Sequence, residues 1–114
     1  MALTIWHNPR CSKSRQTLAL LEERGLTPQV RRYLDDAPSE EELRAAAEAL
    51  GVAPIDMMRP SEKEFLEAGL SRADADDVLF AAMARIPKLI ERPIVFSGGK
   101  AAIGRPPEAV LEIL

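Results

Sequence analysis

A strand, a tight loop, a helix and a second strand follow one another at the start of the chain. Residues 3–6 (LTIW) are short, apolar and partly β-branched, as in a buried strand. From residue 12 the apolar positions recur at helical spacing until Gly25, which is a frequent helix terminator. Residues 29–34 (QVRRYL) predict the second strand. Two strands joined by one helix favour parallel pairing with a right-handed crossover, so we expect an α/β sheet.

The middle of the chain carries helical signals, and its end returns to strands. Ser39 and Glu42 form a capping box before an apolar stripe that ends at Gly51. Further helices are predicted at residues 61–68 and over the apolar stripe that follows Ser71. The segment RPIVFSGGKAAIG predicts two strands joined at a glycine pair, and RPPEAVLEIL predicts a final helix that begins at proline.

This order of elements resembles the thioredoxin-like plan. It predicts an α/β protein with a small mixed sheet flanked by helices, and a helical subdomain inserted after the second strand at about residues 38–86. A chain of 114 residues with 46% hydrophobic side chains is expected to form a single domain over residues 1–114. Because a fold alone does not define a function, the function has to be sought in a site.

The composition of the chain limits the cellular compartment and the classes of partner that we expect for it. The start of the chain lacks the pattern of a signal peptide, and its longest apolar stretch is too short to cross a bilayer. With one cysteine and therefore no intrachain disulfide, we expect a cytoplasmic monomer that does not insert into membranes. The formal net charge of −3 does not favour nucleic acid as a partner. Any anion must therefore be captured by a local arrangement of cations.

The stretch HNPRCSKSR, residues 7–15, contains the only cysteine and the only histidine. It follows the first strand and leads into a helix N-terminus, where open α/β sheets bind ligands and anions. Helix N-termini and cationic neighbours lower the pKa of a cysteine from about 8.5 to roughly 3.5–7.5. Because Arg10, Lys13 and Arg15 flank Cys11, we predict a reactive thiolate. The backbone N–H groups of Ser12, Lys13 and Ser14 are expected to hold a tetrahedral oxyanion beside it.

Structural interpretations stay open for both residues. A single cysteine is often a small buried hydrophobe, although an inert one is usually flanked by apolar residues. His7 is either a hydrogen-bonded structural imidazole or a partner that orients Ser14 or tunes the thiolate. The sequence Cys-Ser-Lys-Ser has no second thiol, so a redox cycle requires an external thiol such as glutathione. One cysteine and one histidine fall short of a zinc site, so we expect no metal and no bound cofactor.

Four motifs lie in order over nearly the whole chain: WHNPRCSKSR, MMRP, PKLIERPIVF and IGRPPEAVLEIL. Together they resemble the glutaredoxin-coupled arsenate reductases, and more narrowly their short branch with Cys-Ser-Lys-Ser. The resemblance implies that Cys11 attacks arsenate or a similar oxyanion, that glutathione is the co-substrate and that glutaredoxin restores the thiol. It assigns the catalytic arginines to Arg59, Arg92 and Arg105, and it implies that His7 and Ser14 polarise or hydrogen-bond the thiolate.

The three arginines share one local context, since each precedes a proline and is thereby held in extended backbone. Planar guanidinium groups suit a multiply charged oxyanion, although any one of these arginines taken alone would be read as a solvated surface residue. The resemblance also places Pro93 at the start of the third strand, facing the cysteine, and implies a cis Arg92–Pro93 bond. The candidate binding and supporting residues are His7, Ser12, Lys13, Ser14, Arg15 and Pro93.

Two other functions stay open. One is a glutathione-dependent thiol protein with another acceptor, or an oxyanion binder without turnover. The other is a regulator of the Spx type that binds RNA polymerase and senses oxidants; that group typically carries a Cys-x-x-Cys switch, and Ser14 occupies the position of the second cysteine. Arg10 departs from the best-known reductase branch, which has a small residue there.

Overall fold

Four strands form one mixed sheet in the order β2-β1-β3-β4. The strands are β1 (Leu3–Trp6), β2 (Gln29–Arg31), β3 (Ile94–Ser97) and β4 (Lys100–Ile103). β1 pairs in parallel with β2, as the strand-helix-strand pattern predicts, and antiparallel with β3. Because Trp6 is paired with Ile94, the segment that precedes β3 lies beside the loop that follows β1.

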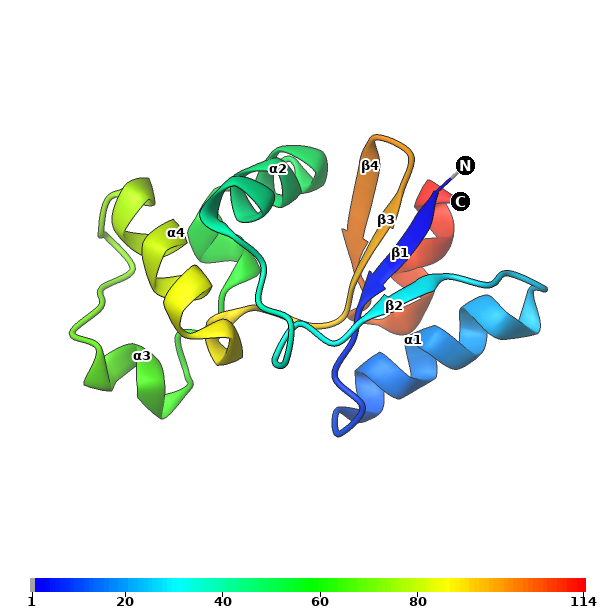
Figure 1. Cartoon of the computed structure of the whole chain (residues 1–114), viewed down its shortest axis with the longest axis horizontal. Helices are drawn as coiled ribbons and strands as arrows, with labels where there is room; N and C mark the ends of the chain where they lie inside the picture. The colour runs from blue at the N-terminus through cyan, green and yellow to red at the C-terminus, as the bar shows by residue number, and fades with distance from the viewer. Residues whose placement is uncertain (1) are drawn as a thin grey trace. The chain divides into compact units, whose positions relative to one another are not determined.

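The computed structural model describes residues 2–114, which divide into two compact units. Residues 2–36 and Arg92–Leu114 form the sheet unit, and Ala37–Glu91 form the helical unit (Figure 1). The predicted α/β class, with helices inserted after the second strand, is confirmed. The predicted insertion at residues 38–86 lies within the helical unit, and the single-domain organisation stays a prediction.

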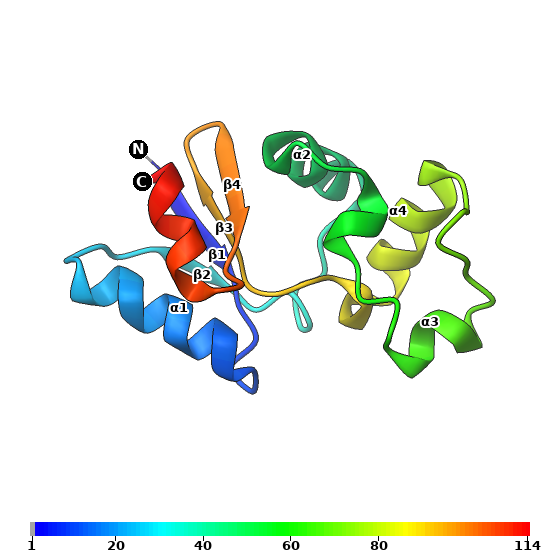
Figure 2. The same ribbon diagram turned by 180° about the vertical axis from the view of Figure 1, so that it is seen from behind.

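The core of the sheet unit lies on one face of the sheet. There α1 (Ser12–Glu23) and the 3-10 helix η3 (Pro107–Ile113) lie on the same side of the strands (Figure 2). One side chain from each of β1, α1, β3 and η3 is fully buried in a common cluster: Ile5, Leu21, Val95 and Val110. Complete burial of such a side chain stabilises a fold by about 1.5–3 kcal/mol, so this cluster fixes α1 against the sheet.

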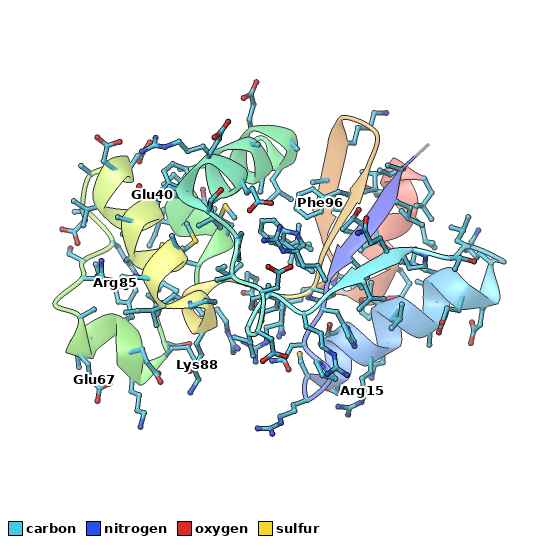
Figure 3. The ribbon with its side chains drawn as sticks, in the orientation of Figure 1. Arg15, Glu40, Glu67, Arg85, Lys88 and Phe96 are labelled. Carbon is cyan, nitrogen blue, oxygen red and sulfur yellow. The ribbon has the colours of Figure 1, made fainter. Side chains whose placement is uncertain are left out.

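The helical unit contains α2 (Glu40–Leu50), η1 (Pro54–Met57), α3 (Lys63–Glu67), α4 (Asp76–Arg85) and η2 (Pro87–Leu89). Its core includes Leu43 of α2 together with Leu79 and Met83 of α4. The capping box of α2 forms as predicted, since the Ser39 side chain accepts from the Glu42 N–H and the Glu42 carboxylate accepts from the Ser39 N–H. Side chains of this unit are shown in Figure 3.

Three elements differ from the sequence expectations. β2 ends at Arg31 rather than at residue 34, because the Arg32 carbonyl accepts hydrogen bonds from the N–H groups of Asp35 and Asp36 in a turn. α3 begins at Lys63, because the preceding residues form a turn in which the Glu62 N–H donates to the Arg59 carbonyl. The final helix begins at proline as predicted, but it is a 3-10 helix. Over residues 2–114, no helix combines the length and apolarity needed to span a membrane.

Candidate active site

The loop after β1 places Cys11 at the N-cap of α1. Asn8 organises this loop, because its carbonyl accepts from the Cys11 N–H at 3.0 Å and its side-chain Oδ1 accepts from the Arg10 N–H at 3.0 Å. The Asn8 N–H itself donates to Ser14 Oγ at 3.0 Å. These bonds tie the loop to the first turn of α1, so the position of the thiol is fixed by the backbone.

The Cys11 thiol is mostly buried, with 8% of the residue exposed. Burial by itself raises the pKa of the thiol, but the pKa is lowered overall from its ordinary value. The causes are hydrogen bonds from the backbone N–H groups of Ser14 and Lys13, and the hydrogen bond and positive charge of Arg92. The predicted effect of the helix N-terminus is therefore present, and it shifts the protonation equilibrium of Cys11 toward the thiolate.

A second arginine reaches the sulfur from the segment after β4. Arg105 Nη2 lies 3.8 Å from Cys11 Sγ, and Arg105 Nε donates to the Arg92 carbonyl at 3.0 Å. Arg92 and Arg105 are thirteen positions apart in the sequence, but pairing of β3 with β4 brings them together. The structure thus brings two of the three predicted arginines to the thiol.

The flanking cations act differently from the sequence expectation. We expected the side chains of Arg10, Lys13 and Arg15 to lower the pKa of Cys11, whereas the principal causes are backbone N–H groups and Arg92. Lys13 contributes through its N–H, and the Arg15 guanidinium donates to the Pro9 carbonyl at 3.0 Å. Arg10 and Arg15 are exposed, and Arg15 projects from the start of α1 (Figure 3). A helix directs its first N–H groups at the cap residue, whereas the Arg15 guanidinium is directed to the Pro9 carbonyl and the Arg10 side chain is exposed.

His7 is buried and hydrogen-bonded to Ser14, with 2.6 Å between Nδ1 and Oγ. Its pKa is lowered from the ordinary value, first by burial and then by the charges of Arg32 and Arg15. A neutral imidazole is therefore favoured, and its Nδ1 can accept the Ser14 hydroxyl proton while Ser14 Oγ accepts from Asn8. This contact matches the interpretation in which His7 orients Ser14, and its part in the chemistry stays a prediction.

Arg59 lies in the helical unit, after the 3-10 helix η1. Its N–H donates to the Leu89 carbonyl at 2.8 Å, which fixes the backbone. Its guanidinium lies 3.1 Å from the Glu62 carboxylate and 3.8 Å from that of Glu91. Arg59 is thus held by two carboxylates, and its predicted action at Cys11 stays a prediction.

The remaining predicted residues lie next to the thiol in the chain or directly before β3. Ser12 is the first residue of α1 and is exposed. The Arg92–Pro93 bond is cis, as predicted, and the Arg105–Pro106 bond is also cis, which was not predicted. The role of Asn8 in organising the loop was not predicted, although an asparagine before proline is a known turn signal.

The arrangement can do nucleophilic chemistry on an anion. A thiolate held by the N–H groups of a helix N-terminus, beside two guanidinium groups, is suited to attack the centre of an oxyanion whose oxygens the guanidinium groups can hydrogen-bond. Among residues 2–114, no group of three or more histidine, cysteine, aspartate and glutamate side chains is placed to hold a metal ion.

Comparison with known proteins gives consistent results. A profile of the ArsC family matches residues 6–113. The chain is 47% identical to a Haemophilus influenzae protein named arsenate reductase, with 100% of both chains covered. It is also 47% identical to the uncharacterized protein YfgD of Escherichia coli, over 96% of this chain and 94% of the relative. A solved structure described as arsenate reductase from Vibrio cholerae has a TM-score of 0.96 and 55% identity, covering 100% of this chain and 98% of that one.

Proposed function

Because this chain belongs to the ArsC family, we propose that it is an arsenate reductase that uses Cys11 as its nucleophile, glutathione as its co-substrate and glutaredoxin as its regenerating partner. The observation that carries the proposal is the Cys11 thiol at the N-cap of α1, whose lowered pKa reflects Ser14, Arg92 and Lys13. Relatives named arsenate reductase at 47% identity over nearly the whole chain support the same substrate.

In the proposed first step, Cys11 Sγ attacks arsenic, one arsenate oxygen leaves as water, and a sulfur–arsenic bond forms. The thiolate of glutathione then attacks Cys11 Sγ. The electron pair of the sulfur–arsenic bond moves to arsenic, which is reduced from arsenate to arsenite, while the two thiols are oxidised to a mixed disulfide. A glutaredoxin thiolate attacks the glutathione sulfur of this disulfide, and Cys11 leaves as the thiolate.

The chain's own groups are assigned to separate tasks in this scheme. The N–H groups at the start of α1 and Arg92 stabilise the Cys11 thiolate. Arg105, which lies next to Sγ, binds an arsenate oxygen, and Arg59 is proposed to supply a third guanidinium group. Each charge-assisted hydrogen bond is worth roughly 1.5–3 kcal/mol, so removal of one arginine is expected to reduce kcat/KM by about tenfold to a hundredfold.

The need for an external thiol, for which we propose glutathione, follows from the cysteine count. The chain has one cysteine, so it cannot form a disulfide within its own site, and the second reducing equivalent must come from another thiol. Arsenate and phosphate have similar shape and charge, so the anion site does not separate them. In the proposed cycle, arsenate is distinguished from phosphate at the reduction step, because arsenic accepts the electron pair of the sulfur–arsenic bond. Such a cycle fits a monomer in a reducing, cytoplasmic compartment, which we propose for this protein.

The test is arsenate-dependent NADPH oxidation with glutathione, glutaredoxin and glutathione reductase. The wild type is compared with Cys11→Ser and with reactions that lack arsenate. We expect turnover with the wild type and none with the variant. Absence of turnover in the folded wild type, with several glutaredoxins tried, would overturn the proposal and move the function to another thiol-dependent or anion-binding role.

A further inference from the structure

We propose that Gly104 is a positioning residue that holds Arg92 and Arg105 at Cys11, because its place in the fold has no room for a side chain. The proposal rests on the anion site proposed above and adds a structural requirement to it. Gly104 follows β4 directly and precedes Arg105. A shift of the Gly104 backbone therefore moves the backbone of Arg105 as well.

The space around Gly104 is closed by two stiff neighbours. A Cβ atom built on Gly104 would lie 2.5 Å from Thr17 Oγ1, 3.2 Å from Thr17 Cγ2 and 2.8 Å from Pro93 Cγ. Thr17 is fully buried on α1 and donates its hydroxyl to the Lys13 carbonyl at 2.8 Å, so its side chain is held in place. Gly104 does not have a positive φ. Lack of space, rather than backbone conformation, therefore requires glycine at this position.

The backbone at Gly104 is connected to both arginines. The Gly104 N–H donates to the Pro93 carbonyl at 2.9 Å, which joins the end of β4 to the segment that carries Arg92. Arg105 Nε donates to the Arg92 carbonyl, and Arg105 Nη2 contacts Cys11 Sγ at 3.8 Å, already a long contact. A Cβ atom at Gly104 would push this backbone away from Thr17 and Pro93. That shift carries Arg105 away from the sulfur and strains its bond to the Arg92 carbonyl.

Gly99 provides a matched control in the same hairpin. It lies in the turn between β3 and β4, and a Cβ atom built there meets nothing within 4 Å. Like Gly104, it does not have a positive φ. Gly99→Ala and Gly104→Ala therefore make the same chemical change at an open position and at a closed one.

The experiment measures alkylation of Cys11 by iodoacetamide as a function of pH, and its protection by arsenate and by sulfate. These readouts need no turnover, so they are independent of whether the protein reduces arsenate. For Gly104→Ala we expect the concentration of arsenate that half-protects Cys11 to rise about tenfold, as for loss of one charge-assisted hydrogen bond. We also expect the pH midpoint of alkylation to rise. Gly99→Ala should match the wild type in both respects.

Thr17→Ala combined with Gly104→Ala tests the mechanism, because it removes the Thr17 hydroxyl and methyl that a new Cβ would meet and leaves only the contact with Pro93 Cγ. We expect the double variant to recover part of the protection lost in Gly104→Ala, when it is compared with Thr17→Ala alone, because the contact with Pro93 remains. If Gly104→Ala does not fold in a thermal unfolding measurement, the same comparison is made between the double variant and Thr17→Ala. A folded Gly104→Ala with wild-type protection and pH midpoint, or a double variant without recovery, would overturn the proposal.

Discussion

At the scale of single residues, the reactivity of Cys11 depends on donors from distant parts of the sequence. The N–H groups of Ser14 and Lys13 come from its own helix, whereas Arg92 comes from the segment before β3. Burial acts in the opposite direction and raises the pKa, so the lowered value is a difference between opposing effects. Removal of one donor is therefore expected to move the pKa upward, because the cost of burial stays.

Arg92→Gln should raise the pKa of Cys11, since both a hydrogen bond and a positive charge at the thiolate are lost. The thiolate is the nucleophile, so the rate of alkylation should fall at pH values between the pKa of the wild type and that of the variant. Well above both pKa values the two rates should converge. The measurement is the rate of iodoacetamide alkylation across pH.

The matched control for Arg92→Gln is Arg24→Gln, an exposed arginine at the other end of α1. It changes the net charge of the chain by the same amount without touching the thiol. A pH profile displaced equally by both substitutions would mean that total charge, not the contact with Arg92, sets the reactivity.

His7 should make stability depend on pH with a defined sign. Its folded-state pKa lies below the ordinary 6.5, so as pH falls through that value the unfolded chain binds a proton before the folded protein does. The free energy of unfolding should therefore be fully retained above pH 6.5 and decrease below it, by at most about 1.4 kcal/mol per pH unit for one proton. Urea unfolding of the wild type and of His7→Gln, between pH 8 and pH 5, measures this difference. Equal pH slopes in the two proteins would contradict it.

At the scale of elements, α2 offers a direct test of local sequence signals. Ser39→Ala removes one half of the capping box and should lower the free energy of unfolding by about 1 kcal/mol, because the Glu42 N–H loses its acceptor. Ser39→Asp keeps an acceptor at the same place and should retain most of the stability. Urea unfolding of the three proteins distinguishes these outcomes, and an equal loss in both variants would show that the cap contributes little.

Elements whose ends are set by local signals could be predicted from the sequence. Elements whose ends depend on hydrogen bonds with other parts of the chain could not. The capping residues and the glycine at position 51 define both ends of α2 within a dozen positions. By contrast, β2 is shortened by the turn that follows it, where Arg31 Nε donates to the Asp36 carbonyl and the Arg32 carbonyl is already occupied. Strand propensity alone cannot reveal this competition for backbone hydrogen bonds.

The same division applies to the candidate site. Its parts that depend on local sequence could be predicted, and those that depend on contacts between distant residues could not. Cys11 at a helix N-terminus follows from the strand-loop-helix order, which is local information. The pairing of β3 with β4 brings Arg92 and Arg105 together, and only the family resemblance pointed to that pair. The close approach of Gly104 to Thr17 links residues far apart in the sequence. No local signal specifies such a contact, because the residues around a glycine that follows a strand do not reveal which distant side chains lie against it.

At the scale of the whole molecule, charge is divided unequally between the two units. The sheet unit contains nine lysines and arginines against six aspartates and glutamates, a formal charge of +3. The helical unit contains six basic and twelve acidic residues, a formal charge of −6, and the two add up to the net −3 of the chain. In addition, residues 2–21 contain no acidic residue. The net charge of the protein is therefore a poor guide to the potential at Cys11.

Comparison of an anionic with a neutral alkylating reagent tests whether the local or the total charge prevails. Iodoacetate and iodoacetamide react at the same sulfur, so the ratio of their rates reports the potential there, and 2-mercaptoethanol supplies the ratio for an uncharged thiol. Because Arg92 and Arg105 lie at Cys11, the ratio for this protein should exceed the reference about threefold to tenfold at low ionic strength. It should approach the reference near 1 M salt, where the Debye length falls to about 3 Å. A ratio below the reference would mean that the net charge of −3 dominates, and the positive site inferred at Cys11 would be refuted.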